Sequence, residues 1–248
     1  MSENPIAVSF GGGVNSTALL IGMYLRQIFP QLILFADTGD EKPETYTHID
    51  SFSSWLVSRG FPSITKIRRN SKHGSLSQEC LNRKMLPAKA FRRPFCSMDW
   101  KVRPQEQFMR EWMKQHRYAY PIHRYIGFDA GESRRAKEVV TEEYVNFYPL
   151  RDWAWDYDKC VEVIEIAGLQ KPVKSACFHC PSSKPEEVLI LRAIHNDLYE
   201  RALEIQANAD YSGTEKVVGL GGTWAWGSEL AKPVHCIEQS CGCFDGEA

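Results

Sequence analysis

Residues 6–17 read Ile-Ala-Val-Ser-Phe-Gly-Gly-Gly-Val-Asn-Ser-Thr, and this stretch decides the fold. The apolar run at 6–10 predicts a buried parallel strand. The spacing of apolar residues at 15–29 predicts a helix that Pro30 ends. Glycines let the backbone turn sharply, and the first turn of a helix offers N–H groups and the positive end of a dipole. Residues 6–17 therefore predict a strand, an anion-binding loop and a helix.

The same alternation of strands and helices continues along the chain. Further strands are expected at 32–36, 63–67, 124–128 and 145–150, and further helices at 46–59, 100–116, 156–167 and 185–208. This order predicts an α/β fold, with a mostly parallel twisted sheet and helices on both faces. Ligands of such sheets bind at the carboxyl ends of the strands, which makes residues 11–16, 37–40 and 129–135 the candidate site segments.

A single boundary is expected in the chain. Residues 1–184 would form the nucleotide-binding domain, with a Cys-x-x-Cys segment included, and residues 185–248 a helix and a cysteine-rich tail packed on the same domain. The glycine loop lacks the Gly-Lys-Ser/Thr of a Walker motif, and its consecutive glycines do not match the dinucleotide fingerprint. The alternative for the loop is a tight strand-to-helix turn that binds nothing.

Composition sets the broad class of the protein. The chain has 248 residues, 43% of them hydrophobic and 25% charged, which is ordinary for a globular protein. No apolar run is long enough to span a bilayer, and the first ten residues do not look like a secretory signal. We therefore expect a cytoplasmic protein without a membrane partner. In a reducing compartment, its eight cysteines favour metal binding or catalysis over disulfides.

Positive charge is concentrated in one segment. Residues 66–117 hold 14 Lys and Arg against 4 Asp and Glu, although the whole chain has a net charge of −1. Such a segment suits the phosphates of a nucleotide or of a nucleic acid. The alternative is a solvated surface whose acidic neighbours lie elsewhere in the fold.

Six short elements, taken in order, resemble one enzyme family. They are the glycine loop, residues 35–41, the Cys-x-x-x-x-Lys-x-x-Pro-like stretch 96–104, residues 127–135, residues 148–153, and residues 174–181. This series resembles the PP-loop family of N-type ATP pyrophosphatases and sulfonucleotide reductases. It is most similar to phosphoadenosine phosphosulfate reductase-like proteins of phages and mobile elements, in the iron–sulfur branch. The resemblance implies the adenine nucleotide alpha hydrolase-like fold.

The resemblance also implies a set of site residues. Those that would bind the nucleotide are Ser9, Gly11, Gly12, Gly13, Asn15, Ser16, Asp37, Thr38, Gly39, Lys101, Glu132 and Arg135. Asn15, Ser16 and Arg135 would also act in catalysis. The loop departs from the family pattern Ser-Gly-Gly-x-Asp-Ser, because Gly11 replaces a serine, Val14 a common lysine and Asn15 the aspartate. The missing lysine would have to be replaced by Arg134, Arg135 or the basic segment.

The cysteines form the second part of the predicted site. Cys177-x-x-Cys180 can hold a metal ion or one edge of a cluster, or act as a redox pair. The resemblance implies a [4Fe–4S] cluster on Cys96, Cys177 and Cys180, with Cys160 as the first choice for a fourth ligand. Alternatives are a three-cysteine cluster with one open iron, and Zn²⁺ completed by His179 or Cys160.

The other cysteines and two tryptophan pairs have different expected roles. Cys80 is expected to be a small apolar core residue. In a reductase, Cys241 would be the nucleophile, and Cys236 and Cys243 lie beside it in the C-terminal tail. The two Trp-Ala-Trp stretches, 153–155 and 224–226, could stack on a base, but core packing is favoured.

These expectations combine into one leading function and two alternatives. The leading hypothesis is an ATP- and Mg²⁺-dependent enzyme that adenylates a nucleic acid (tRNA or DNA) or a nucleotide-derived substrate, releases pyrophosphate and inserts sulfur from a donor protein. The first alternative is a sulfonucleotide reductase. The second is a nucleotide-binding module without catalysis, which the loop's missing lysine favours slightly.

Overall fold

The computed structural model describes residues 4–210 and 216–227, and its contacts divide the chain into two compact units. Unit 1 consists of residues 1–36, 43–67 and 102–175, and unit 2 of residues 37–42, 68–101 and 176–248. The single domain boundary expected after residue 184 stays a prediction. Both units are assembled from separated segments, so no change of composition along the chain marks where one ends and the other begins.

Unit 1 is built on a five-stranded parallel sheet. Its strands are β1 (Ile6–Ser9), β2 (Leu32–Ala36), β3 (Ile64–Ile67), β4 (Ile122–Ile126) and β5 (Tyr144–Phe147), in the order β3-β2-β1-β4-β5 with all four pairings parallel. The predicted α/β class is thus confirmed. Strand order reverses between β1 and β4, and in open α/β sheets the crevice beyond the carboxyl ends of such a strand pair is where ligands bind.

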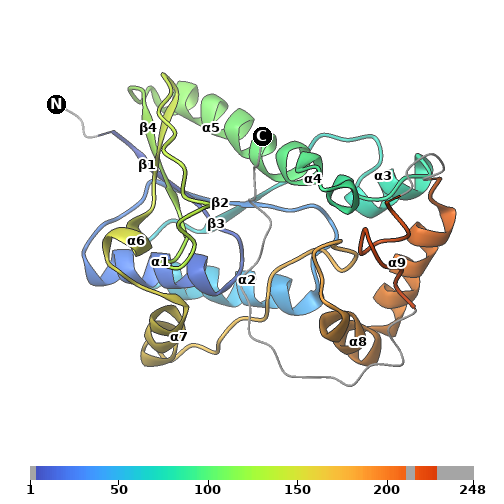
Figure 1. Ribbon diagram of the computed structural model, residues 1–248. Helices are drawn as coiled ribbons and strands as arrows, with labels where there is room; N and C mark the ends of the chain where they lie inside the picture. The colour runs from blue at the N-terminus through green and yellow to red at the C-terminus, as the bar shows by residue number, and fades with distance from the viewer. Residues whose placement is uncertain (1–3, 211–215, 228–248) are drawn as a thin grey trace. The chain divides into compact units, whose positions relative to one another are not determined.

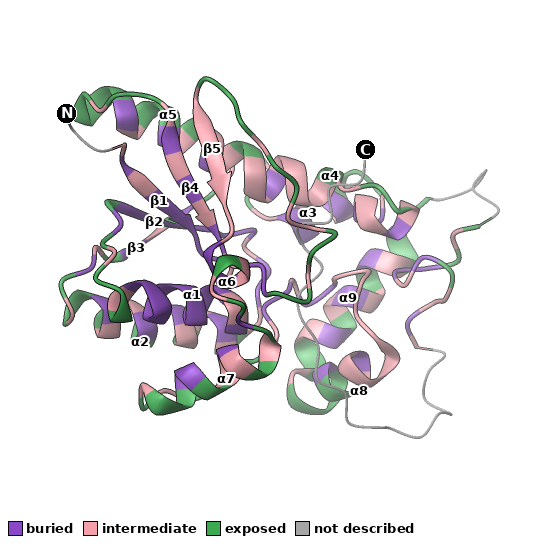
Figure 2. Ribbon diagram, turned by 60° about the vertical axis from the view of Figure 1, so that its left-hand side comes forward, coloured by how far each residue is buried: buried purple, intermediate pink, exposed green. Residues whose placement is uncertain are grey.

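Helices cover both faces of this sheet (Figure 1). One face is covered by α1 (Val14–Leu25), α2 (Pro43–Val57) and α7 (Tyr157–Ile166), with the short α6 (Pro149–Asp152) nearby, and the other by α5 (Arg103–His116). Side chains alternate between the faces, as strand geometry requires. Val8 packs with α1 and α2, whereas its neighbour Ala7 packs with Met109 and Met113 of α5. The strands β1 and β2 are consequently almost wholly buried (Figure 2).

The first helix is shorter than its apolar spacing predicts. It ends at Leu25, and Gln27 has a left-handed backbone with φ of 55°. The N–H of Ile28 then bonds the carbonyl of Met23 at 2.9 Å and the N–H of Gln27 bonds that of Tyr24 at 3.0 Å. This is the Schellman pattern that closes helices, here formed without glycine.

Unit 2 consists of short helices around its own core. They are α3 (Leu76–Asn82), η1 (Ala88–Phe91), α4 (Phe95–Ser97), the π-helical turn η2 (Met98–Val102), α8 (Pro185–Ile194) and α9 (Asn196–Asn208). Trp100, Leu86 and Leu220 are among the most deeply buried side chains of this core. The basic segment is thus divided into several short helical pieces, in addition to the single helix that was expected at 100–116.

The predicted long helix at 185–208 is wrong in one respect, because it is two helices. His195 lies between them with φ of −131° and ψ of 68°, which is not helical. The break allows Val188 and Leu191 of α8 and Tyr199 of α9 to enter the same apolar cluster. Core packing, rather than local propensity, therefore determines the end of α8.

Core packing also accounts for the two tryptophan pairs. Trp155 is buried in the core of unit 1, and Trp153 packs against that core. Trp226 is buried in the core of unit 2, with Trp224 stacked on it at a ring-centroid distance of 6.3 Å. The prediction that these tryptophans pack in the core is confirmed.

Candidate functional site

The glycine loop of unit 1 joins β1 to α1 by a sharp turn. Gly12 has φ of 78°, a conformation that side chains disfavour, and a Cβ there would come within 3.2 Å of Thr45. Gly13 is the N-cap of α1, and no side chain caps this helix end. The N–H groups of the first helical turn have no partner inside a helix. The loop therefore presents the start of α1 as a site for an anion.

The loop also contacts the end of β4 through backbone atoms. A Cβ on Gly127 would lie 2.9 Å from the carbonyl oxygen of Asn15 and from the backbone nitrogen of Ser16. Only glycine fits at this distance. Ser9 is the last residue of β1, buried and paired with Ile126 of β4. The two strand ends at the reversal of strand order are thus in direct contact.

Two carboxylates from the segment after β4 converge on Asn15. Its Nδ2 atom donates to Oδ2 of Asp129 at 2.8 Å and to Oε2 of Glu132 at 2.9 Å. Its Oδ1 atom is buried and has no hydrogen-bond partner among the described residues. The aspartate of the family pattern would place a third carboxylate here, so an amide at position 15 removes a repulsion that a cation would otherwise have to relieve.

Glu132 and Arg135 form an ion pair beside this cluster, through Oε1 and Nη1. The guanidinium of Arg135 lies over the ring of Phe128, 4.4 Å from its centroid. Phe128 itself stacks on Tyr148. Asn15, Glu132 and Arg135, which were predicted as site residues, are thus brought together in unit 1.

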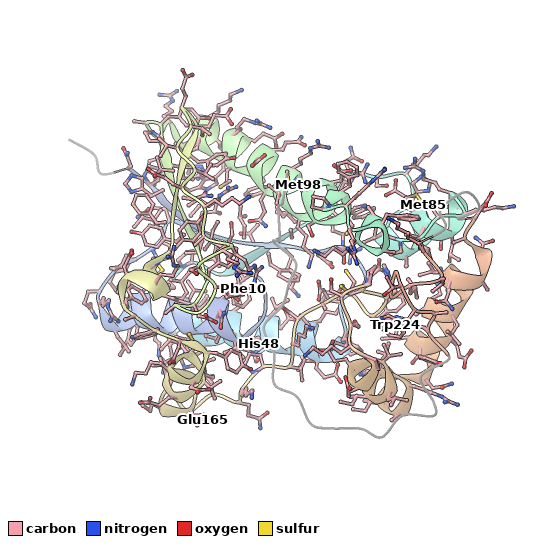
Figure 3. All side chains as sticks on the ribbon, in the orientation of Figure 1. Phe10, His48, Met85, Met98, Glu165 and Trp224 are labelled. Carbon is pink, nitrogen blue, oxygen red and sulfur yellow. The ribbon has the colours of Figure 1, made fainter. Side chains whose placement is uncertain are left out.

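His48 contacts the start of α1 next to the loop, and no sequence pattern singled it out. Its Nε2 atom is 2.9 Å from Oγ1 of Thr17, and that hydroxyl also donates to the carbonyl of Gly13 at 2.9 Å. The His48 ring stacks on Phe52 and lies near Phe10 (both His48 and Phe10 are labelled in Figure 3). Burial lowers the pKa of His48 to about 4. Histidine at this place on a helix face gives no signal that sequence patterns can detect.

The segment after β2 belongs to unit 2, and its contacts are made there. Asp37 pairs with Arg68 at 2.6 Å and accepts a bond from the N–H of Gly39 at 2.8 Å. Oγ1 of Thr38 lies 3.1 Å from Sγ of Cys177. These three residues, which were predicted to bind the nucleotide, are therefore tied to unit 2 by contacts that the sequence does not reveal.

Unit 2 contains a pocket with three thiols in its wall. It encloses about 440 Å³, part of it open to solvent, and the residues that line it are Thr38, Leu76, Pro87, Lys89, Cys96, Ser97, Lys101, Cys177, His179, Cys180, Pro181 and Ser182. Three of the four predicted cysteine ligands thus meet at one pocket, together with two lysines. Burial, and then the negative charge of Glu41, raise the pKa of Cys177 well above the usual value of a thiol.

A buried hydrogen-bond network supports one wall of the pocket. Nε2 of His179 lies 3.0 Å from Oδ2 of Asp40. Asp40 also accepts bonds from the backbone and the hydroxyl of Ser77, at 2.6 and 2.7 Å. Burial alone would raise the pKa of Asp40, but the bonds from His179 and Ser77 outweigh it and lower the pKa. This network links three segments that are far apart in the sequence.

Cys160 and Cys80 have a different environment from the pocket cysteines. Cys160 is fully buried in the apolar core of unit 1, and burial raises its pKa to about 12. Cys80 is buried in the core of unit 2, as expected, also with a pKa raised to about 12. Among the described residues, no three His, Cys, Asp or Glu side chains are arranged to hold a single metal ion.

Two further predictions concern the C-terminal cysteines and membrane-spanning helices. The C-terminal cysteines Cys236, Cys241 and Cys243 lie outside the described residues, so the reductase nucleophile stays a prediction. Within residues 4–210 and 216–227, every helix is too short or too polar to cross a bilayer.

Comparisons with known proteins give distant similarities. No protein-family model matches the chain. The uncharacterized protein MJ0973 of Methanocaldococcus jannaschii is 22% identical over 231 residues, covering 89% of this chain and 51% of that protein. The chain thus spans about half the length of this relative. Among solved structures, the U34-tRNA thiolase NcsA from Methanococcus maripaludis with its [4Fe-4S] cluster is similar with a TM-score of 0.45 and 16% identity, over 97% of this chain and 84% of that one. Similarity at this level does not assign a family.

Proposed function

We propose that the chain is an ATP-dependent sulfur-transfer enzyme whose glycine loop binds the phosphates of ATP together with Mg²⁺. The observation that carries this proposal is the uncapped start of α1 beside two carboxylates on Asn15. Asp129 and Glu132 would repel a bare phosphate chain. Mg²⁺ is commonly held by one or two carboxylates together with substrate phosphates. ATP as its magnesium complex therefore fits both the anion site at the start of α1 and the two carboxylates beside it.

The chain's own residues would act on the nucleotide in three ways. The N–H groups of the loop and of α1 bind phosphate oxygens. Asn15 and Ser16 hold the phosphate end in place, since both lie in the first turn of α1. Arg135 contributes positive charge, which stabilises the charge that develops as pyrophosphate leaves. A lysine at position 14 is not required if Arg135 fills this role.

The reaction we propose has two steps. A carbonyl oxygen of the substrate attacks the α-phosphorus of ATP, and pyrophosphate leaves. A sulfide-level nucleophile from a sulfur donor then forms a C–S bond as the C–O bond to AMP breaks, and the sulfur loses its proton. No oxidant or reductant is needed for this sequence. The substrate is a nucleic acid or a nucleotide-derived molecule.

The thiol pocket of unit 2 supports the sulfur half of the proposal. Cys96, Cys177 and Cys180 line it, and thiolates are the usual ligands of iron–sulfur clusters. A single Zn²⁺ needs four donors around one point, and such an arrangement is not found among the described residues. We prefer a three-cysteine [4Fe–4S] cluster to zinc because, when bound, it would supply an iron able to hold the sulfide that the proposed reaction uses. The burial of Cys160 argues against its use as a fourth ligand.

The test is to incubate the protein with ATP, Mg²⁺ and candidate substrates, and to measure pyrophosphate release and nucleotide affinity. Asn15→Ala and Arg135→Met should each reduce the rate at least about tenfold, the effect of losing one charged hydrogen bond. Arg110→Met is the matched control, because Arg110 of unit 1 pairs with Glu143 at the surface. Sulfite release from phosphoadenosine phosphosulfate would identify a reductase instead, and nucleotide binding without turnover would identify a binding module.

A further inference from the structure

The segment before Cys96 carries an exposed aromatic ring in a strongly basic environment. Phe95 is 53% exposed. It is the first residue of α4, directly before the pocket cysteine Cys96. Phe91, four residues earlier, packs against the core of unit 2, and Phe95 is not among the side chains that do so. The Phe95 ring therefore has a face available to a partner.

The chain segment that carries this ring is strongly positive. Residues 68–101 of unit 2 contain nine Lys and Arg against two Asp and Glu. One of the two acids, Glu79, accepts bonds from Arg69, Arg83 and Trp100. Arg92 and Arg93 are exposed, and no carboxylate pairs with either of them within the described part of the chain. The segment has a net charge of +7 on 34 residues, which the pairs of Arg68 with Asp37 and of Lys101 with Glu41 offset in part. The positive charge that is left over favours an anionic partner.

An exposed aromatic ring beside unpaired arginines is the combination that binds unpaired bases. Every base offers a flat face that can stack on an aromatic side chain, and arginine binds phosphate through a planar fork of N–H groups. In a duplex the bases are already stacked and paired. A single strand, a loop or an end is therefore the form of nucleic acid that can use Phe95.

We propose that Phe95, Arg92 and Arg93 bind single-stranded nucleic acid, with one base stacked on Phe95 and phosphates bound by the two arginines. This inference rests on the proposed function, and it narrows the substrate to an unpaired segment of RNA or DNA. Because Cys96 follows Phe95 directly and lines the thiol pocket, a base stacked on Phe95 would be held one residue along the chain from a side chain of that pocket. Phe95 and the arginines are positioning residues, not catalytic ones.

The experiment is fluorescence anisotropy with labelled 20-nucleotide probes: single-stranded RNA, single-stranded DNA and a duplex of the same sequence. Both single strands should bind more tightly than the duplex, and the RNA and DNA arms identify the sugar that is preferred. Phe95→Ala should weaken single-strand binding about tenfold, the effect of losing one stacked base. Phe95→Trp should retain binding, and the emission of the added tryptophan should be quenched by the probe.

Charge and exposure have separate controls. Ile190→Ala removes a side chain of unit 2 with the same 53% exposure and should leave binding unchanged. Arg92→Gln and Arg93→Gln should each lower the slope of log affinity against log salt by about 0.7. Lys114→Gln removes an exposed charge of unit 1 from the same basic segment and should change the slope less.

The outcomes separate this inference from the proposed function. Equal binding by Phe95→Ala and the unaltered protein, or equal binding of duplex and single strand, would overturn it, even if calorimetry shows that ATP binds and pyrophosphate forms. Conversely, single-strand binding that depends on Phe95 would support the nucleic-acid-binding surface even if the protein binds no ATP. In that case only the proposed function fails.

Discussion

The Nζ atom of Lys101 lies 3.0 Å from Oε1 of Glu41, a side chain that is fully buried. Removing the lysine would leave an uncompensated carboxylate in the interior of unit 2. We expect Lys101→Met to lower the free energy of unfolding by about 3–5 kcal/mol, because the burial cost of the remaining charge is then not offset. Urea unfolding followed by circular dichroism measures this.

Two further variants show whether the pair is the cause. Glu41→Gln combined with Lys101→Met should recover much of the lost stability, since no buried charge remains. Lys66→Met removes a pair with Asp50 whose two side chains are 38% and 66% exposed, and should cost less than about 1 kcal/mol. A Lys101→Met protein of normal stability would contradict the structural role and favour a purely ligand-binding one.

Asn15 separates two carboxylates, and its replacement should make stability depend on magnesium. In Asn15→Asp, a third carboxylate faces Asp129 and Glu132, which lie within 2.9 Å of the present amide. Without metal this variant should melt lower than the unaltered protein, and Mg²⁺ should raise its melting temperature by several degrees because a cation relieves the repulsion. Differential scanning calorimetry with and without Mg²⁺ tests this. Asn15→Ala is the control, and an equal response to Mg²⁺ in both variants would refute the argument.

Gly127 and Gly11 should differ sharply in their tolerance of alanine. A Cβ on Gly127 would meet backbone atoms of Asn15 and Ser16 at 2.9 Å, whereas one on Gly11 would meet only the Ser16 hydroxyl at 3.8 Å. Gly127→Ala must therefore separate β4 from the start of α1, and we expect a loss of about 2–4 kcal/mol in stability, as in other overpacked sites. Gly11→Ala should stay within about 1 kcal/mol. Comparable unfolding midpoints for the two would show that this contact is absent.

His48 should make unit 1 less stable in mild acid. Its folded pKa of about 4 lies below the ordinary histidine pKa of 6.5, so the unfolded chain binds the proton more readily. The stability contribution is complete above pH 6.5 and decreases as the pH falls towards 4. The slope is at most about 1.4 kcal/mol per pH unit, because the two states differ by at most one bound proton. The total loss is reduced by solvent screening, because His48 is partly exposed. Thermal melts at pH 7, 5.5 and 4.5 measure it. His48→Gln should flatten this part of the profile, and an unchanged profile would contradict the assignment.

Sequence patterns were sufficient for the sheet and for the glycine loop. The strands β1 and β2 are continuous apolar runs because both of their faces are covered, and the loop is marked by three adjacent glycines. The division of residues 185–208 into two helices could not be predicted, because it depends on which side chains share the core of unit 2. The two units escaped prediction for the same reason, since contacts between distant segments define them.

The sequence predicted which segments form the candidate site, but not which side chains in them contact one another. Residues 129–135 were expected beside the loop because both follow neighbouring parallel strands. That Asn15 donates to Asp129 as well as Glu132 depends on side-chain rotamers, which no spacing reveals. The resemblance assigned Thr38 to the nucleotide, whereas in the structure its side chain contacts Cys177. The roles of Cys160 and of the C-terminal cysteines stay predictions.

The chain crosses between the two units five times, and this restricts how the protein can be rearranged in evolution. The segments of the two units alternate along the chain. Cutting the chain once therefore cannot release either the unit with the glycine loop or the unit with the thiol pocket as one continuous fragment. A gene fusion or truncation that carried over the loop alone would leave its sheet without β4 and β5. The unit with the glycine loop and the unit with the thiol pocket must therefore be inherited together, and new specificities are expected to arise by substitution within them, not by exchange of modules.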